Sequence, residues 1–365
     1  MNNNPKVLFV MHMPPPVHGA SMVGKYIHDS KLINYELECY YLNPTTAKDL
    51  EDVGSFRIGK LIDVFSLMKK VKSTVKEITP DLVYFTANAT GFAFYKDYLI
   101  VRALKKLGCK VVVHYHNKGV SSRQNNFLDN LLYKSFFNGL NVILLADNLY
   151  ADVEKYISKD SVQICENGIP DEVDQIAEKD NNKFEILYLS NMMEEKGVWI
   201  LLQACKELKE RGVDFKCNFV GGWKDISKDS FQARIDEFGL RDRVKPWGPK
   251  YGEEKKEFLS NASVLVFPTY YHNECFPLVL LEGMMYGLAC VSTNEAGIPS
   301  IIDNNKTGLI VEKQNHLALV NALEKLANNA DLCKNMGKLG REKYERLFTL
   351  PVFEQRMVSC LKNLL

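Results

Sequence analysis

The sequence predicts an α/β protein made of two doubly wound, Rossmann-like domains. Short β-rich runs alternate with longer helical stretches, and runs such as VLFV and VVV are apolar on both faces, which is typical of parallel strands covered by helices on both sides. A polar stretch interrupts this alternation, which then restarts. A length of 365 residues suits two domains of ordinary size, and a single large α/β barrel is the main competitor.

The predicted strands fall into two sets, one on each side of the polar stretch. The first set is Val7–Met11, Leu37–Leu42, Leu82–Phe85, Lys110–Tyr115, Val142–Leu145 and Val162–Cys165. The second set is Glu185–Leu189, Lys216–Val220, Arg243–Pro246, Val264–Phe267, Ala289–Ser292 and Gly308–Val311. Helices are expected near 20–33, 58–77, 92–107, 125–138 and 147–157, then near 197–211, 230–238, 252–260, 278–287 and 314–328, with a helical tail over 331–364.

The polar stretch over residues 167–183 is predicted to be a linker, because it contains Gly168 and Pro170 and no periodic apolar run. We therefore expect an N-terminal domain over 1–168, a linker over 169–183 and a C-terminal domain over 184–347, followed by a last helix over 348–365. Doubly wound sheets bind ligands at the carboxyl ends of their strands. Two such edges facing each other across a cleft would enclose a small molecule made of two parts.

Composition narrows the class of protein. Lys and Arg number 46 and Asp and Glu 45, so the basic excess of a nucleic-acid-binding protein is missing. The nine cysteines form no C-x-x-C pair and lie mostly in apolar runs, which favours reduced thiols in a cytosolic protein. No apolar run approaches the roughly 18 residues of a membrane span. We interpret the N-terminal stretch as a buried strand and a turn, not as a signal peptide.

The sharpest motif contains Glu274 and Glu282, eight positions apart in ECFPLVLLE. The first follows the strand Val264–Phe267, and the second lies within an apolar helix, where an ionised carboxylate is costly unless it has partners. A carboxylate accepts two hydrogen bonds at once, which suits a ribose diol. The alternative is that Glu282 pairs with a buried cation and that Glu274 is a solvated loop acid.

The helix that carries Glu282 is expected to begin near Pro277–Val279. Its first backbone N–H groups have no partner within the helix, and the helix dipole favours negative charge at that end. This start is therefore predicted to be an anion site suited to a diphosphate.

Residues 264–311 resemble the family 4 retaining glycosyltransferases of GT-B fold. That family carries E-x7-E between two C-terminal strands, followed by a G-x-P…D…G stretch, which here read ECFPLVLLE and AGIPSIIDNNKTGLIV. The resemblance covers most of the chain, and it implies that the last helix, over 348–365, crosses back to the N-terminal domain. It implies that Glu274 contacts the donor sugar, that Glu282 contacts the nucleotide ribose, and that the amides of Leu278 and Val279 face the diphosphate. The intervening donor-site residues are Cys275, Phe276 and Pro277.

A second motif is LYLSNMMEEKGVWILLQA, where Lys196 lies in a strand-to-helix loop. A lysine there can neutralise a departing phosphate, and the alternative is an exposed lysine at a helix start. Members of the resembled family usually show G-R before this loop and K-G after it. Lys196 and Gly197 match, whereas Ser190 and Asn191 replace G-R. Either Asn191 donates a neutral hydrogen bond, or another cation supplies the missing charge.

Two glycine-containing turns are further donor-site candidates. In HMPPPVHGAS, Gly19 would let the backbone approach a phosphate or sugar closely, although it could equally serve only the turn. In WGPKYG, the resemblance implies that Gly248, Pro249 and Lys250 border the nucleobase. No G-x-G-x-x-G follows a strand, which argues against a dinucleotide-dependent oxidoreductase.

The stretch VVVHYHNKG places His114 and His116 on one face at the end of a strand. No third or fourth ligand accompanies them, so zinc is not expected. The resemblance implies that His116 lies near the donor sugar and the reaction centre. The alternative is a core histidine whose ring is satisfied internally.

Residues 57–78 combine helical apolar spacing with a basic face made of Arg57, Lys60, Lys69, Lys70, Lys72 and Lys76. Such a helix can lie on an anionic membrane, or it can pack on the sheet with a solvated basic face. The aromatic-rich stretch 125–139 is also compatible with binding of a lipid-linked acceptor. We expect a cytoplasmic protein, with a peripheral position at the inner face of the membrane as the second option.

The resemblance predicts a retaining hexosyltransferase that moves a sugar from a UDP- or GDP-sugar to the hydroxyl of a saccharide or lipid-linked acceptor, in cell-surface polysaccharide or glycolipid synthesis. His116, Glu274 and Lys196 would be catalytic. The sequence contains no D-x-D pair, so neither a metal nor another cofactor is expected. The alternatives are a nucleotide-sugar 2-epimerase of the same architecture and a non-catalytic nucleotide-sugar-binding protein.

Overall fold

The computed structural model describes residues 4–15, 19–44, 58–176 and 184–365. The chain forms two compact units, of which the first comprises Met1–Asn167 with Leu350–Leu365 and the second Gly168–Thr349. The sequence predicts that the N-terminal domain ends at 168, the linker at 183 and the C-terminal domain at 347. The part of the predicted linker over 177–183 lies outside the described residues.

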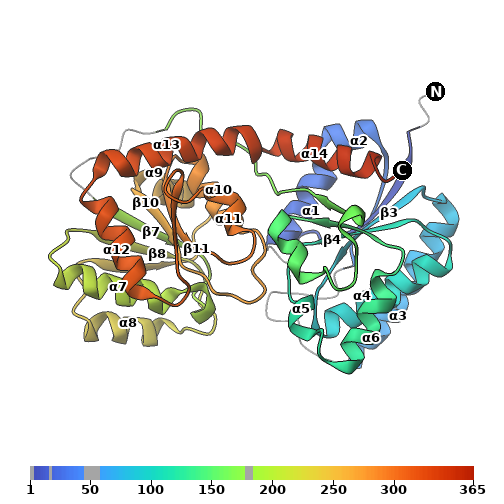
Figure 1. The fold of residues 1–365 in the computed structure, drawn as a ribbon, viewed down its shortest axis with the longest axis horizontal. Coiled ribbons are helices and arrows are strands. Elements are labelled where there is room, and N and C mark those ends of the chain that lie inside the picture. Colours follow the sequence, from blue (N-terminus) through green and yellow to red (C-terminus); the bar gives the residue numbers. More distant parts are fainter. Residues whose placement is uncertain (1–3, 16–18, 45–57, 177–183) are drawn as a thin grey trace. The chain divides into compact units, whose positions relative to one another are not determined.

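The first unit contains a parallel sheet in the order β2-β1-β3-β4-β5-β6 (Figure 1). Its strands are β1 Lys6–Val10, β2 Glu38–Leu42, β3 Leu82–Ala87, β4 Val111–Tyr115, β5 Asn141–Leu144 and β6 Val162–Ile164. β3 and β4 are buried along their whole length, as the continuous apolar runs predict. Six strands in one parallel sheet confirm the doubly wound prediction for this unit.

Helices cover both faces of this sheet. One layer contains α1 Gly19–Asp29, α2 Lys31–Glu36 and α14 Leu350–Lys362, and the other contains α3 Ile58–Ile78, α4 Gly91–Lys106 and α6 Phe127–Phe137. The short elements are α5 Val120–Arg123, η1 Asp147–Asp152 and η2 Lys159–Ser161. The two layers arise because right-handed crossovers place helices on opposite faces when the strand order reverses direction.

Two predicted helices of this unit differ from the structure. The one over 20–33 is divided, because the Ser30 side chain accepts a backbone N–H and so caps the start of a new helix. The one over 147–157 is only the 3₁₀ turn η1. There the carboxylate of Asp152 accepts hydrogen bonds from the amides of Gly119, Val120 and Ser121, and this contact holds the segment in a tight turn.

The second unit contains another parallel six-stranded sheet, in the order β12-β11-β10-β7-β8-β9. Its strands are β7 Glu185–Leu189, β8 Lys216–Val220, β9 Val244–Gly248, β10 Val264–Phe267, β11 Ala289–Thr293 and β12 Gly308–Val311. Its helices are η3 Glu194–Lys196, α7 Val198–Glu210, α8 Lys228–Glu237, α9 Gly252–Asn261, α10 Leu278–Met285, α11 Ile298–Ile301, α12 His316–Ala327 and α13 Ala330–Leu347. Every predicted strand of the chain is therefore present, with bounds that agree within two residues.

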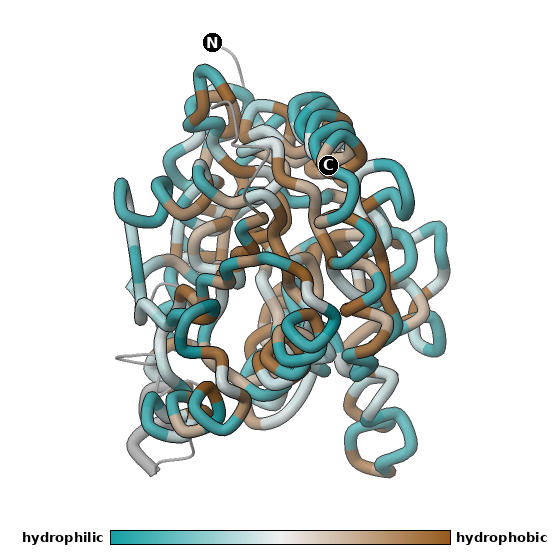
Figure 2. Tube along the Cα trace, turned by 90° about the vertical axis from the view of Figure 1, so that its left-hand side faces the viewer, coloured by the Kyte–Doolittle hydropathy of each residue, from teal (hydrophilic) through white to brown (hydrophobic). Residues whose placement is uncertain are grey.

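The apolar residues gather on the strands and on the inner sides of the helices, and hydrophilic residues cover the helix surfaces (Figure 2). The last helix, α14, completes the core of the first unit by burying Phe353, Met357 and Leu361. It also pairs Arg356 with Glu166 at 3.1 Å. Among the described residues, no helix is long and apolar enough to cross a membrane.

Candidate functional site

The candidate site lies at the carboxyl edge of the second unit's sheet, where β7 and β10 are neighbours. The loop after β7 carries Lys196 in η3, and the loop after β10 carries Glu274. Tyr270 N–H donates to the carbonyl of Glu195 at 2.8 Å, which fastens the two loops together. The ends of neighbouring parallel strands are the usual ligand position in this class of fold.

Lys196 and Glu274 form a largely buried ion pair in which Nζ donates to Oε2 over 2.6 Å. The exposed fractions of the two side chains are 15% and 10%. Thr269 Oγ1 lies 3.3 Å from the same Oε2, and the lysine Nζ lies 4.4 Å from the centre of the Tyr271 ring. Removing one member of such a pair would leave the other charge buried without a partner, so each group holds the other in place.

The second carboxylate oxygen of Glu274, Oε1, accepts no hydrogen bond from any residue in the described part of the chain. It does not belong to the fully buried atoms without a partner, so it is accessible. A ligand hydroxyl could therefore donate to Oε1 while Oε2 keeps its lysine. This arrangement suits a carboxylate that contacts a sugar.

Close backbone approaches shape the loop that carries Lys196. Gly197 has φ +82°, and a Cβ there would lie 2.2 Å from the carbonyl oxygen of Pro268. A Cβ on Gly221 would lie 1.7 Å from the carbonyl oxygen of Ser190. Neither position tolerates a side chain without a shift of the neighbouring strand end. These two glycines therefore fix where the loop after β7 lies.

Glu282 projects from α10 into half-exposed surroundings and pairs with Lys255 of α9 at 3.0 Å. Glu282 was expected to need a partner, and Lys255 is that partner. This lysine is accessible at the surface, since 30% of its side chain is exposed. The interpretation of Glu274 as a solvated loop acid is wrong, because Glu274 is the buried member of the pair of glutamates.

The start of α10 offers free amides. Pro277 precedes the helix without a side-chain cap, and the N–H groups of Leu278 and Val279 donate to no residue that the structure describes. Cys275 and Phe276 are buried behind this helix start. The geometry matches the predicted anion site.

Asn191 is exposed in the loop after β7, and a Cβ on Gly222 would lie 3.3 Å from its Oδ1. Its backbone is held by Tyr188, whose hydroxyl donates to the Asn191 carbonyl at 3.1 Å. The neutral side chain at this position thus remains accessible to a ligand.

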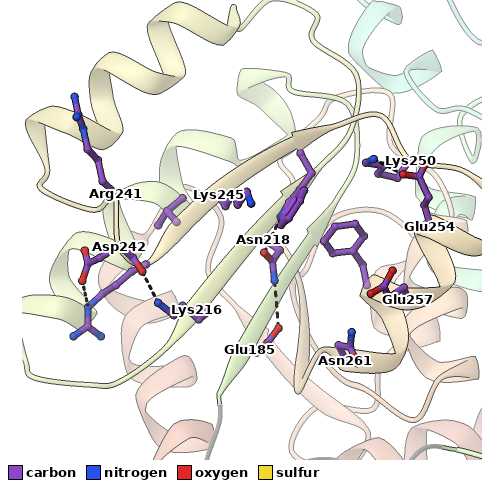
Figure 3. Close-up of a pocket in the computed structure, with 14 residues that line it drawn as sticks. Glu185, Lys216, Asn218, Arg241, Asp242, Lys245, Lys250, Glu254, Glu257 and Asn261 are labelled. Carbon is purple, nitrogen blue, oxygen red and sulfur yellow. Dashed lines mark hydrogen bonds and ion pairs between the residues drawn. The ribbon is translucent and has the colours of Figure 1, made fainter.

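A groove of about 520 Å³ lies elsewhere in the second unit, over β8 and β9 (Figure 3). α9 packs on β7, and its side chains Glu257 and Phe258 line the groove beside these strands. Trp247 donates to Asn218 there at 2.8 Å. Neither Lys196, Glu274 nor Glu282 lines the groove.

The predicted nucleobase residues lie where this groove meets the end of β9. Gly248 ends the strand with φ +70°, Pro249 follows, and Lys250 lines the groove while it pairs with Glu254. Figure 3 places Lys250 and Glu254 side by side.

The remaining predicted residues belong to the first unit. Gly19 begins α1 and is exposed, and a Cβ added to it would meet no atom of the described residues within 4 Å, so packing against those residues does not demand a glycine there. In the same helix, a Cβ on Gly24 would lie 2.0 Å from the carbonyl oxygen of His12. The role of Gly24 was not predicted, because nothing in the local pattern reveals that close approach.

His116 is half-buried just beyond β4, and its ring packs on that of His114 with centroids 4.2 Å apart. His114 is fully buried, and its Nδ1 lies 2.6 Å from the Tyr84 hydroxyl. Burial, with a smaller contribution from His116, holds the pKa of His114 well below its ordinary value, so His114 is neutral. His114 is thus the core histidine of the two, and His116 is the one nearer the loop.

Comparison with known proteins decides the family. Residues 170–343, which contain the whole candidate site of the second unit, match the family described as Glycosyl transferases group 1. This segment belongs to that family. The putative colanic acid biosynthesis glycosyltransferase WcaL of Escherichia coli (strain K12) is 30% identical over 187 residues, which cover 49% of this chain and 45% of WcaL. The chain thus matches about half the length of this curated relative.

Solved glycosyltransferase structures share the fold over nearly the whole chain. Sucrose-phosphate synthase from Thermosynechococcus elongatus superposes with a TM-score of 0.76 at 18% identity and covers 99% of each chain. Anabaena Alr3699/HepE in complex with UDP gives a TM-score of 0.75 at 15% identity, covering 98% of this chain and all of that one. The GT-B fold class predicted from the glycosyltransferase motifs is thereby confirmed.

Some residues of the candidate site were not foreseen. Thr269 and Tyr271 surround the Lys196–Glu274 pair, and Glu295, buried after β11, pairs with Lys313 at 3.0 Å. All follow strand ends at the same sheet edge, and that position is the signal that could have found them. Sequence alone does not reveal the partnership of Glu295 and Lys313, which lie eighteen positions apart.

Proposed function

We propose that the chain is a retaining glycosyltransferase whose second unit binds a nucleotide-sugar donor and transfers the sugar to an acceptor hydroxyl in polysaccharide synthesis. The observation that carries the proposal is the largely buried Lys196–Glu274 pair at the strand edge of the Glycosyl transferases group 1 segment. The polysaccharide assignment is supported by the WcaL relative, which is named for colanic acid biosynthesis. HepE, a structure of the same fold, was solved with UDP and supports a UDP-sugar.

In the proposed reaction, the bond between the anomeric carbon and the diphosphate oxygen breaks, and the acceptor oxygen bonds to the same carbon. The leaving diphosphate gains negative charge, which Lys196 and the free amides at the start of α10 would stabilise. Glu274 would position Lys196 through Oε2 and would hold a sugar hydroxyl through Oε1. The acceptor proton would pass to the departing phosphate, which accounts for a retaining reaction without a nucleophilic carboxylate.

Glu282 would bind the ribose diol, with Lys255 orienting its carboxylate from the adjacent helix. For His116, the family resemblance implies a position near the donor sugar. Because the sequence lacks D-x-D, we propose that these groups stabilise the leaving group without a divalent metal.

The test is binding and turnover with Glu274→Gln and Lys196→Met. Thermal-shift titration with UDP, GDP and ADP should reveal one preferred nucleotide, since ligand at 100 times its dissociation constant adds about 2.7 kcal/mol of stability. Lys196→Met should lose most of this shift. Glu274→Gln should keep nucleotide binding. It should lower the rate at which UDP is formed from UDP-sugars by about 100-fold or more, because the carboxylate no longer positions the donor sugar and Lys196.

Lys255→Met provides the matched control, because it removes a lysine that pairs with a glutamate of the same unit without touching the departing phosphate. It should weaken nucleotide affinity less than tenfold and leave the turnover of bound donor unchanged. Appearance of an epimerised nucleotide sugar without acceptor would identify an epimerase instead, and binding without any turnover across acceptors would identify a non-catalytic binding protein.

A further inference from the structure

Two thiols of the first unit lie in contact where α14 packs beside the end of β6. Cys165 directly follows β6, and Cys360 lies in the last turn of α14. The two thiols are hydrogen-bonded to each other, and the Cys360 thiol also donates to the Ile164 carbonyl at 3.7 Å. All nine cysteines of the chain are free, so the two thiols are reduced in this structure.

A second contact holds the same two segments together. One turn before Cys360, Arg356 Nη1 donates to the Glu166 carbonyl at 2.9 Å and pairs with the Glu166 carboxylate at 3.1 Å. Residues four apart lie on one face of a helix, so positions 356 and 360 both face residues 164–166. The helix cannot slide or rotate without breaking these contacts. The sulfur atoms therefore stay close, and a short closing movement would bring them to the bond length of about 2.05 Å.

The two thiols differ in acidity. The hydrogen bond from Cys165 lowers the pKa of the Cys360 thiol, burial opposes this shift, and the Arg356 guanidinium adds to it. Burial and the same hydrogen bond raise the pKa of Cys165 well above its ordinary value. The thiolate is the nucleophilic form of cysteine. Cys360 is therefore the thiol that reacts first, and Cys165 lies in place to attack the product.

A thiol pair of the second unit differs in exposure. Cys205 of α7 and Cys217 of β8 are hydrogen-bonded to each other, and both are 0% exposed. Burial, with the hydrogen bond to Cys205, raises the pKa of Cys217 well above its ordinary value. Cys360 keeps an exposed fraction of 6%, which gives a small molecule a route to its sulfur. We expect the thiols of the second unit to stay reduced under conditions that oxidise those of the first.

We propose that Cys165 and Cys360 form a redox site that hydrogen peroxide converts into an intramolecular disulfide. The Cys360 thiolate attacks one peroxide oxygen, the O–O bond breaks, and hydroxide leaves and is protonated to water while Cys360 becomes a sulfenic acid. The Cys165 sulfur then attacks the Cys360 sulfur, and its proton leaves with the displaced hydroxide as a second water. Two thiols and one peroxide thus give one disulfide and two waters. The inference goes beyond sugar transfer and does not depend on it.

The disulfide would join the two chain segments that build the first unit. Segments 1–167 and 350–365 are otherwise linked covalently only through the second unit. A cross-link that closes so long a loop restricts the unfolded chain strongly, and α14 could no longer leave the first unit's core without reduction. Oxidation should therefore raise the melting temperature of the first unit by about 5–10 °C. The transition of the second unit should stay in place.

The experiment is oxidation of the folded full chain with hydrogen peroxide, followed by alkylation of free thiols and tryptic mapping without reductant. The wild type should yield peptide 160–179 joined to peptide 357–362, and dithiothreitol should separate them and reverse the rise in melting temperature. In Cys165→Ser, dimedone should trap a sulfenic acid at Cys360. In Cys360→Ser, Cys165 should gain no dimedone adduct. Arg356→Met should slow cross-linking about tenfold, whereas Arg356→Lys should keep most of the rate.

The pair in the second unit provides the matched control. Cys205→Ser should leave the cross-link between Cys165 and Cys360 unchanged, and no cross-link between Cys205 and Cys217 should form in the wild type. Circular dichroism melts establish that each variant folds before oxidation. A folded wild type that gives no joined peptide, or gives it only in urea, would overturn the proposal. Cross-linking of the two pairs at equal rates would also overturn it, because exposure and acidity would then not select the site.

Discussion

Single residues in this protein owe their chemistry to what surrounds them. Glu274 is buried, and one of its carboxylate oxygens accepts a hydrogen bond from Lys196. Glu282 lies in the more apolar stretch of sequence, yet it is half-exposed and pairs with Lys255. The sequence pattern identifies both glutamates and Lys196 but does not show which carboxylate is buried. Burial depends on which side of α10 faces the sheet, and an all-apolar helix gives no periodic signal for that.

His114 should make the first unit sensitive to acid. Its neutral state is enforced by burial, whereas the unfolded histidine takes up a proton near pH 6.5. Below that pH the unfolded state binds more protons than the folded state, so the free energy of unfolding should fall by up to about 1.4 kcal/mol per pH unit from this group. Calorimetric melting between pH 7.5 and 5 should show a shallower pH dependence in His114→Asn, which can keep the Tyr84 hydrogen bond.

His28→Asn is the control, since His28 is exposed and lies beside Asp29 at the surface of α1. A pH dependence that is identical in His114→Asn and in the wild type would contradict this account of His114.

Helices, strands and loops follow from local sequence more closely than the contacts between them do. All strands were predicted, because a short continuous apolar run bounded by turns strongly favours a buried strand in an alternating α/β pattern. The 3₁₀ turn η1 was mistaken for a helix, because its conformation depends on Asp152 reaching three amides that lie 31 to 33 positions earlier in the chain. The importance of Gly24 and Gly221 was missed for the same reason, since each is set by a carbonyl from another segment.

Gly221→Ala should disturb the element that presents Lys196. Its new methyl group would overlap the Ser190 carbonyl at the end of β7, so we expect a loss of about 3 kcal/mol in the unfolding free energy of the second unit. Chemical denaturation measures the loss, and UDP titration should show weaker binding because the loop after β7 must shift. Gly19→Ala, where a Cβ would meet none of the described atoms within 4 Å, should leave stability unchanged. Comparable destabilisation by both substitutions would refute the steric explanation.

The whole molecule is assembled from a first unit made of two chain segments and a second unit made of one. The C-terminal α14 belongs to the first unit, where it buries Phe353, Met357 and Leu361. A last helix that crosses back was expected on the strength of the family resemblance. How the two units face each other stays a prediction of that resemblance.

Phe353→Ala should therefore destabilise the first unit alone, by about 3–5 kcal/mol, since it removes a fully buried aromatic side chain. Scanning calorimetry should show one transition moving to lower temperature while the transition of the second unit, marked by its shift with nucleotide, stays in place. Gln355→Ala, at an exposed position of the same helix, should move neither. A joint shift of both transitions in Phe353→Ala would show that the units melt as one.

The two connections between the units have an evolutionary consequence. Ile169 N–H donates to the Phe348 carbonyl at 2.9 Å, and Ile169 forms a parallel bridge with Thr349, so the beginning and the end of the second unit are adjacent. A gene segment that encodes residues 168–349 could accordingly be exchanged as a single cassette, in one recombination event, while the host framework on either side remains intact. Under the proposed function, the preference for the donor could then change in one step rather than through successive substitutions.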